Sequence, residues 1–264
     1  MTPNRLARQT VRLLTLALLS TATCCTAAAA PTVTLNATLT PEYLGQGTTI
    51  SFGFNITNPA NQTPPPLTNV EISYQVELAF ALSELGLATC STQKLEAFGV
   101  EGCPPNAVMG YGTALAEIPI GPSLASEAAE VTILRATNRS GHLALLIYVN
   151  APTPISGQFV FPALLLPAKH PYGGRLDMAI PLITSFPQGP DVAVTQFHST
   201  LGPLHLHYRE QKQGHTIEYT PKGPPLPNRC PHGGFQFAAT FAFQDGSHAT
   251  ASTKVPCPRD SSGR

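Results

Sequence analysis

An alternating run of apolar residues near the C-terminal end constrains this fold more than any other feature. The run Phe235–Phe243 carries Phe or Ala at every second position, with Gln, Ala and Thr between them. A period of two places the phenylalanines on one face of a β-strand. Asp245-Gly246 favours a tight turn, and His248–Val255 reads as the returning strand. The sequence therefore predicts a hairpin whose aromatic face needs a second sheet to cover it.

Cysteines stand at both ends of this hairpin and at both ends of a second short segment. Leaving aside the two cysteines near the N-terminus, the chain carries Cys90, Cys103, Cys230 and Cys257. Four cysteines in an exported chain indicate a disulfide framework with three possible connectivities. Sequence proximity favours Cys90–Cys103 and Cys230–Cys257. A structural zinc site would need close ligand pairs such as C-x-x-C, and the sequence contains none.

Two-residue alternation recurs through the chain and predicts a mainly β protein. Three such runs, near residues 32–39, 48–57 and 70–80, are separated by turn segments, an order typical of immunoglobulin-like domains. We expect an antiparallel β-sandwich of immunoglobulin-like type, built as one or two packed units. One short helix is expected over Ser91–Phe98, with Ser91 as its cap and both Leu95 and Phe98 toward the core.

Charge and composition narrow the function classes. Only 11% of the residues are charged, and 15 basic residues balance 15 acidic ones. No net field would attract nucleic acid or anionic lipid, so we expect no nucleic-acid partner. The 27 prolines and 21 glycines fit many short strands joined by turns. Hydrophobic residues make up 42% of the chain, which argues against general disorder.

The N-terminal stretch has the order of a secretory signal. Basic residues precede a short apolar run, and small residues follow at the expected cleavage site. The apolar run is too short to span a membrane, so we expect a secreted chain without a transmembrane segment. Lipid attachment at Cys24 or Cys25 to the cell envelope is the alternative, although Thr21 stands where such signals usually carry an aliphatic residue. The expected segments are 1–29 as signal peptide, 30–89 as an immunoglobulin-like β segment, 90–257 as a disulfide-stapled β-sandwich segment and 258–264 as a polar tail.

Three stretches carry a family resemblance: GLATC ending at Cys90, KLEAFGVEGCPPNAVMGYGTA around Cys103, and NRCPHGGFQFAATFAFQDGSHATASTKVPC ending at Cys257. Together they resemble a family of secreted bacterial proteins, common in actinomycetes, that has no established function. The closing CP-x-GG…F-x-DG…PC hairpin is the most specific of the three. The resemblance implies export and a β-rich fold, and it implies no catalytic residues.

A search for chemical motifs yields one candidate site. The sequence contains no nucleophile elbow, phosphate-binding loop, dinucleotide fingerprint or H-E-x-x-H zinc motif. In LHLHYREQKQGHTIEYT, a turn that pairs Glu210 with His215 would place His207 opposite Glu218. His205, His207 and Glu218 would then share one face and could bind a divalent metal. The alternative is a solvated outer face that only keeps the strand soluble.

Three functional hypotheses follow. The first is a non-catalytic exported protein that binds a cell-envelope or extracellular component, or supports the envelope, through its surface. The missing motifs, the neutral charge and the cysteines favour it. The second is a metal carrier or metal-dependent enzyme that uses the His205–His207 face. The third is an exported hydrolase whose nucleophile lies in a loop without a local motif.

Overall fold

The computed structural model describes residues 30–59, 62–75, 80, 83–121, 123–152 and 156–257. The predicted signal peptide and the predicted polar tail lie outside these ranges. The elements are β1 (Thr32–Thr40), β2 (Thr49–Thr57), β3 (Leu67–Tyr74), α1 (Thr92–Phe98), η2 (Val100–Gly102), η3 (Pro105–Ala107), β4 (Val108–Ile120), β5 (Ser123–Arg139), β6 (His142–Ala151), β7 (Gly157–Pro167), β8 (Gly174–Ala179), β9 (Ala193–Leu201), β10 (Tyr208–Lys212), β11 (His215–Tyr219), β12 (Phe235–Phe243) and β13 (His248–Val255). Within the described ranges no helix is long and apolar enough to cross a membrane.

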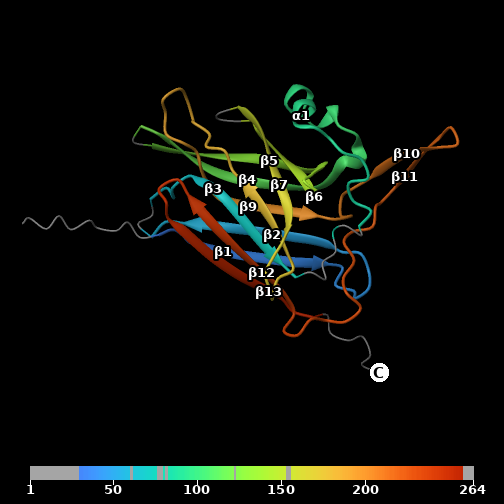
Figure 1. Ribbon diagram of the computed structural model, residues 1–264. Coiled ribbons are helices and arrows are strands. Elements are labelled where there is room, and N and C mark those ends of the chain that lie inside the picture. The colour runs from blue at the N-terminus through green and yellow to red at the C-terminus, as the bar shows by residue number, and fades with distance from the viewer. Residues whose placement is uncertain are drawn as a thin grey trace, which may run out of the picture.

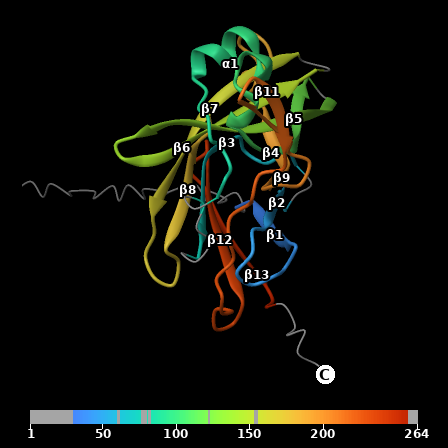
Figure 2. The same ribbon diagram turned by 90° about the vertical axis from the view of Figure 1, so that its right-hand side faces the viewer.

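Antiparallel pairing dominates the fold, as the sequence predicts. In the described part of the chain, eleven strands form one sheet in the order β1-β2-β9-β4-β5-β6-β7-β8-β3-β12-β13. The sheet curls until its edge strands β1 and β13 come into contact, so it is nearly closed into a barrel (Figures 1 and 2). The prediction of a mainly β fold with one short α-helix is confirmed. This pairing gives one continuous large sheet, so it does not specifically confirm the two facing sheets of the predicted immunoglobulin-like sandwich.

Long-range pairing joins the two predicted segments in this one sheet. β2 from the first segment pairs with β9, and β3 lies between β8 and β12. The single sheet therefore contains strands from both 30–89 and 90–257. Pro162 and Pro167 predict that β7 is an edge strand or a bent one; the edge position is wrong, because β7 pairs with both β6 and β8. Its pairing with β8 begins at Ala163, so Pro162 stands just outside that ladder, where no N–H is required.

The C-terminal hairpin has the alternation that its sequence predicts. Phe235, Phe237, Phe241 and Phe243 are buried, and Gln236 between them is more exposed. The turn closes where the amide of Gly246 donates to the carbonyl of Phe243. The curled sheet itself covers the aromatic face: the ring of Phe241 meets the ring of Phe54 of β2 edge to face, with centroids 5.0 Å apart.

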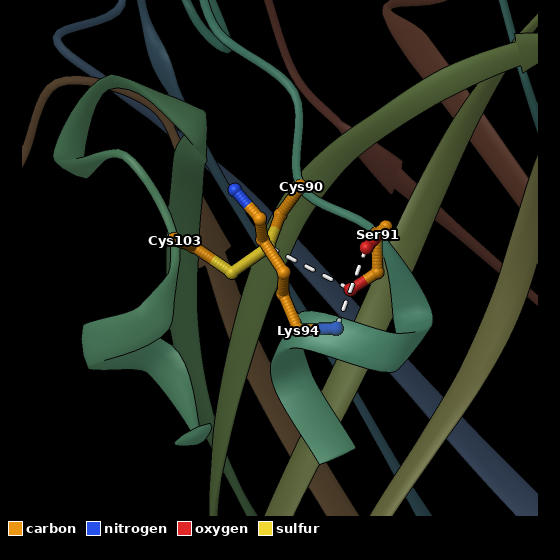
Figure 3. Close-up of a disulfide and its surroundings, with 4 residues drawn as sticks. All are labelled: Cys90, Ser91, Lys94 and Cys103. Carbon is orange, nitrogen blue, oxygen red and sulfur yellow. Dashed lines mark hydrogen bonds between the residues drawn. A yellow bond between two sulfur atoms is a disulfide. The ribbon is translucent and has the colours of Figure 1, made fainter. Parts of the chain in front are cut away.

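Both predicted disulfides are confirmed. Cys90 bonds Cys103 across 13 positions of the chain, and Cys230 bonds Cys257 across 27 positions. The first bridge closes the segment that contains α1 (Figure 3). It ties the residue before the helix cap to the loop that follows η2, so this segment is held at both ends.

The short helix is confirmed, with one correction to its packing. The side chain of Ser91 accepts a hydrogen bond from the backbone N–H of Lys94 at 3.3 Å (Figure 3), as a helix cap does. Leu95 is fully buried as predicted. The prediction that Phe98 faces the core is wrong, because its side chain is 72% exposed. Phe98 is the last residue of α1. The helix ends at Gly99, whose φ of 63° changes the direction of the chain.

Candidate functional site

An apolar cavity of about 410 Å³ occupies one end of the barrel. This volume lies within the roughly 300–1,000 Å³ of small-molecule sites in proteins. Its lining comes from β2–β9 and from the loop between β8 and β9. The described lining residues are Phe54, Leu67, Val70, Ala114, Ala116, Glu127, Ala129, Val131, Ile147, Val149, Ala151, Ser156, Gly157, Gln158, Phe159, Phe161, Met178, Ile180, Ile183, Thr184, Val192, Val194 and Phe197.

Small side chains on the inner face of the β4–β5 pair create this space. Ala114 stands opposite Ala129 in the ladder, and Ala116 stands opposite Glu127. All four residues line the cavity. Larger side chains in the same positions would reach across the barrel and fill it, as core side chains do elsewhere in proteins. The cavity is therefore a property of the alanine-rich stretch of these two strands.

Glu127 is the one ionisable side chain among the described residues that line the cavity. Only 5% of its surface is exposed. It is in phase with Ala129 and Val131, which point inward, whereas the intervening Ala128 and Glu130 are exposed. Glu127 therefore adds one buried polar side chain to a wall that is otherwise mostly apolar.

Three side chains form the floor of the cavity. Ile147, Met178 and Phe197 line it and also line a second, inner cavity of about 80 Å³. The ring of Phe197 stacks on Phe54 with centroids 5.4 Å apart, which fixes the floor from the β2 side. Tyr74 lines the inner cavity, and burial raises the pKa of its hydroxyl to about 12. The barrel interior is thus apolar on both sides of this floor.

The opening lies where the lining becomes polar and exposed. Ser156, Gln158 and Thr184 are the exposed polar members of the lining. They come from the loop before β7, from β7 itself and from the segment between β8 and β9. That segment is held by hydrogen bonds from Ser185 N–H to Pro190 O (3.1 Å) and from Ser185 Oγ to the same carbonyl (2.9 Å). An apolar interior with a polar rim is the usual form of a small-molecule site.

The predicted metal ligands lie elsewhere, around the hairpin of β10 and β11, which projects from the main sheet (Figure 1). His205 and His207 are exposed and precede β10. The predicted register is wrong by two residues: Arg209, and not His207, stands opposite Glu218. The guanidinium Nε of Arg209 donates to Glu218 Oε1 at 2.7 Å. His205 lies at φ 64°, in a turn and not in a strand.

The described residues contain no group of three or more His, Cys, Asp or Glu side chains arranged to hold a metal ion. The metal role of His205, His207 and Glu218 stays a prediction that this arrangement does not strengthen. The alternation in the same stretch is nevertheless real, because Leu206 and Tyr208 between the exposed residues are buried. Tyr208 has a structural part: its hydroxyl accepts from Gly86 N–H at 2.9 Å and donates to Val108 O at 2.5 Å.

One further spacing bears on the hydrolase hypothesis. Ser91 and Lys94 match the S-x-x-K spacing of some serine hydrolases. Here the hydroxyl of Ser91 caps α1, and the Lys94 side chain points away from that hydroxyl (Figure 3). Nucleophilic catalysis requires the serine and its base within hydrogen-bonding reach. The pair therefore serves the helix cap in this structure, and the hydrolase hypothesis stays untested.

Sequence reasoning missed the cavity and Glu127. The signal was present in the stretch SLASEAAEVTI, where Glu127 keeps the two-residue phase of Ala129, Val131 and Ile133. The small-residue stretch before Glu130 reads as a loop, whereas β5 begins at Ser123. Comparison with known proteins gives no further guidance, because no protein-family model, no curated protein and no solved structure matches the chain.

Proposed function

We propose that this protein is a non-catalytic binding protein that takes up an apolar small molecule in the cavity at the end of its barrel. The observation that carries the proposal is a cavity of about 410 Å³ whose wall is almost entirely apolar. Burying apolar surface is worth about 25 cal/mol per Å², so an apolar guest gains affinity from nearly every contact with this wall. The polar rim leaves an entry from water.

Export fits the same role. The signal-like N-terminal stretch and the disulfides Cys90–Cys103 and Cys230–Cys257 favour a chain that works outside the cytoplasm, free or at the cell envelope. The proposed family of secreted actinomycete-type proteins agrees with that location. In fold class we propose a flattened barrel whose opposite faces pack as the layers of a sandwich do. The contact of Phe54 with Phe241 between β2 and β12 supports that description.

Surface binding through the loops is the second candidate. An open cleft of about 800 Å³ lies at the barrel end that also carries the cavity. Its wall is rich in proline, including Pro64, Pro119 and Pro190, and it also contains Asp191 and Asp245. Loops at the ends of β-sheets commonly carry binding residues. The cleft is the weaker candidate, because both of these carboxylates already accept hydrogen bonds from within the protein.

Fluorescence titration with N-phenyl-1-naphthylamine, a neutral apolar dye, tests the cavity proposal. The unmodified protein should bind the dye with a blue-shifted emission. Ala129→Phe, which fills the cavity, should weaken binding by at least about tenfold, a change of 1.4 kcal/mol. Ala128→Phe is the matched control, because Ala128 lies next in the same strand and is exposed; it should leave affinity within about twofold.

Overpacking can destabilise a fold, so thermal unfolding of each variant accompanies the titration. Ala114→Leu offers a smaller filling change on the opposite wall if Ala129→Phe does not fold. Absence of dye binding to the unmodified protein would count against the proposal. Equal binding by a folded filling variant would also do so, and would direct attention to the outer cleft.

A further inference from the structure

The apolar space of the barrel continues beyond the floor of the binding cavity. The inner cavity, of about 80 Å³, shares Ile147, Met178 and Phe197 with the binding cavity of about 410 Å³ (the outer cavity). Apart from Ser199 and the hydroxyl of Tyr74, the described lining of the inner cavity consists of aliphatic, aromatic and thioether side chains. Its volume exceeds the roughly 10–15 Å³ that one water molecule needs, and cavities with such walls accept small apolar guests. The two cavities are therefore adjacent compartments of one apolar interior.

The inward face of β6 runs through both compartments. Ala151, Val149 and Ile147 line the outer cavity. The next inward residues of the same strand, Leu145 and Leu143, line the inner cavity. A strand rises about 3.3 Å per residue, so this face extends for roughly 26 Å along β6. A ligand that contacts both compartments must therefore be long.

The two compartments differ in width. Small side chains such as Ala114, Ala116 and Ala129 line the outer cavity. Larger side chains such as Ile133 and Leu145 line the inner cavity, which has about 80 Å³ against about 410 Å³. The deep compartment therefore has room for a slender part of a ligand, such as an unbranched chain, and not for a wide ring system.

The floor between the compartments contains one flexible side chain. Phe197 is held by its stack on Phe54, and Ile147 is β-branched and therefore stiff about χ1. Met178 is unbranched, and methionine side chains adapt readily to the shape of the space around them. A small rotation of Met178 would join the two cavities without any change in the backbone. Met178 is therefore the point at which a chain would pass the floor.

We infer that the barrel binds a single long unbranched alkyl chain, whose tail passes Met178 and ends in the inner cavity. The head of such a ligand lies at the polar rim of Ser156, Gln158 and Thr184, whose side chains are uncharged. This inference rests on the proposed function, and it adds the shape of the ligand and its direction. Each further methylene group that enters the apolar interior should strengthen binding by about fourfold.

A comparison of chain and ring on the unmodified protein tests the inference without relying on any variant. Octanol, decanol and dodecanol, each with a terminal hydroxyl, displace N-phenyl-1-naphthylamine at concentrations below their solubility limits. Each step of two carbons should strengthen binding by about fifteenfold. Cyclododecanol has as many carbons as dodecanol, but its ring is too wide to pass the floor. It should bind at least about tenfold more weakly than dodecanol.

The variant Leu165→Phe fills the inner cavity from β7, because Leu165 lines that cavity and not the outer one. It should weaken dodecanol binding by at least about tenfold, while the affinities for cyclododecanol and for the dye stay within about threefold. Leu164→Phe is the matched control, since Leu164 is the next residue on β7 and lines neither cavity. It should leave dodecanol affinity within about twofold. Thermal unfolding shows whether both variants are folded.

The outcomes separate this inference from the function on which it rests. If the dye does not bind the unmodified protein, the cavity proposal itself fails. If the dye binds and dodecanol and cyclododecanol compete equally, the cavity proposal stands and the chain inference is overturned. The chain inference is also overturned if folded Leu165→Phe keeps the full affinity for dodecanol, because the tail would then lie outside the inner cavity. If Leu165→Phe does not fold, the comparison of chain and ring decides.

Discussion

Ala116 and Glu127 occupy directly opposed positions in the β4–β5 ladder, and both side chains line the cavity. The smallest β-carbon side chain thus faces a buried carboxylate across one strand pair. The pairing places one polar side chain in a mostly apolar wall, which connects the local sequence of two strands to the proposed binding of an apolar molecule.

The aromatic contact across the barrel should dominate the stability of the fold. Phe241→Ala removes a fully buried ring that meets Phe54, and it should lower the free energy of unfolding by about 3–5 kcal/mol. Phe98→Ala is the control, because its ring is exposed; it should change stability by no more than about 0.5 kcal/mol. Urea denaturation followed by circular dichroism measures both. A loss below about 1 kcal/mol for Phe241→Ala would show that the barrel core is not packed as described.

The disulfides should be intact in the purified protein, and each should stabilise it. Peptide mapping without reduction should recover Cys90 with Cys103 and Cys230 with Cys257. On the chain-entropy account, replacing either pair by alanine should lower stability by about 3–4 kcal/mol, with the longer Cys230–Cys257 loop at the higher end. Recovery of any cross-pair would contradict the arrangement of the strands.

Alkaline pH should destabilise the protein through its buried tyrosines. Burial raises the pKa of Tyr74 from 10 to about 12, so the folded state disfavours the ionised hydroxyl. Its contribution to stability is complete below pH 10 and is lost as the pH rises through 12. Tyr74→Phe should flatten the loss of melting temperature in this window, whereas Tyr43→Phe, at an exposed site, should not.

The alkaline effect should be reduced and not abolished in Tyr74→Phe. Burial also raises the pKa of Tyr148, Tyr208 and Tyr219, in the same direction. An unaltered melting profile between pH 10 and 12 in Tyr74→Phe would mean that Tyr74 is solvated in the folded protein.

The hydroxyl of Tyr208 should stabilise the contact between two distant segments. Tyr208→Phe leaves the buried N–H of Gly86 and the carbonyl of Val108 without this partner, and it should cost about 1–3 kcal/mol. Tyr111→Phe, at an exposed position, is the control. Hydrogen exchange should report faster exchange at Gly86 N–H in the first variant alone. Unchanged protection there would contradict the bridging role.

Local patterns in the sequence are sufficient to predict the C-terminal hairpin and the helix cap. The alternation of Phe235–Phe243 depends on neighbours along one strand, and the cap at Ser91 depends on the next three residues. The sheet order could not be predicted in this way, because β3 pairs with β12 across more than half of the described chain. Such pairings depend on the shape of the whole core and leave no local signal.

The errors around the candidate sites have similar causes. β5 begins at Ser123, earlier than its composition suggests, since pairing with β4 overrides the weak strand preference of alanine and glutamate. The register around Glu218 depends on a two-residue turn at Gln213-Gly214, both with positive φ, where the composition suggests a longer loop. Each difference moves functional side chains: the first brings Glu127 into the cavity, and the second pairs Glu218 with Arg209.

The central claim is that an apolar molecule binds inside the barrel. The most direct test is a titration of protein labelled at its Ile and Val methyl groups with N-phenyl-1-naphthylamine, followed by NMR. The account predicts the largest shifts at Ile147, Val131 and Val149, which line the cavity, and no shift at Ile217 on the exposed β11. Shifts confined to surface methyl groups such as Ile217, or none at saturating dye, would contradict it.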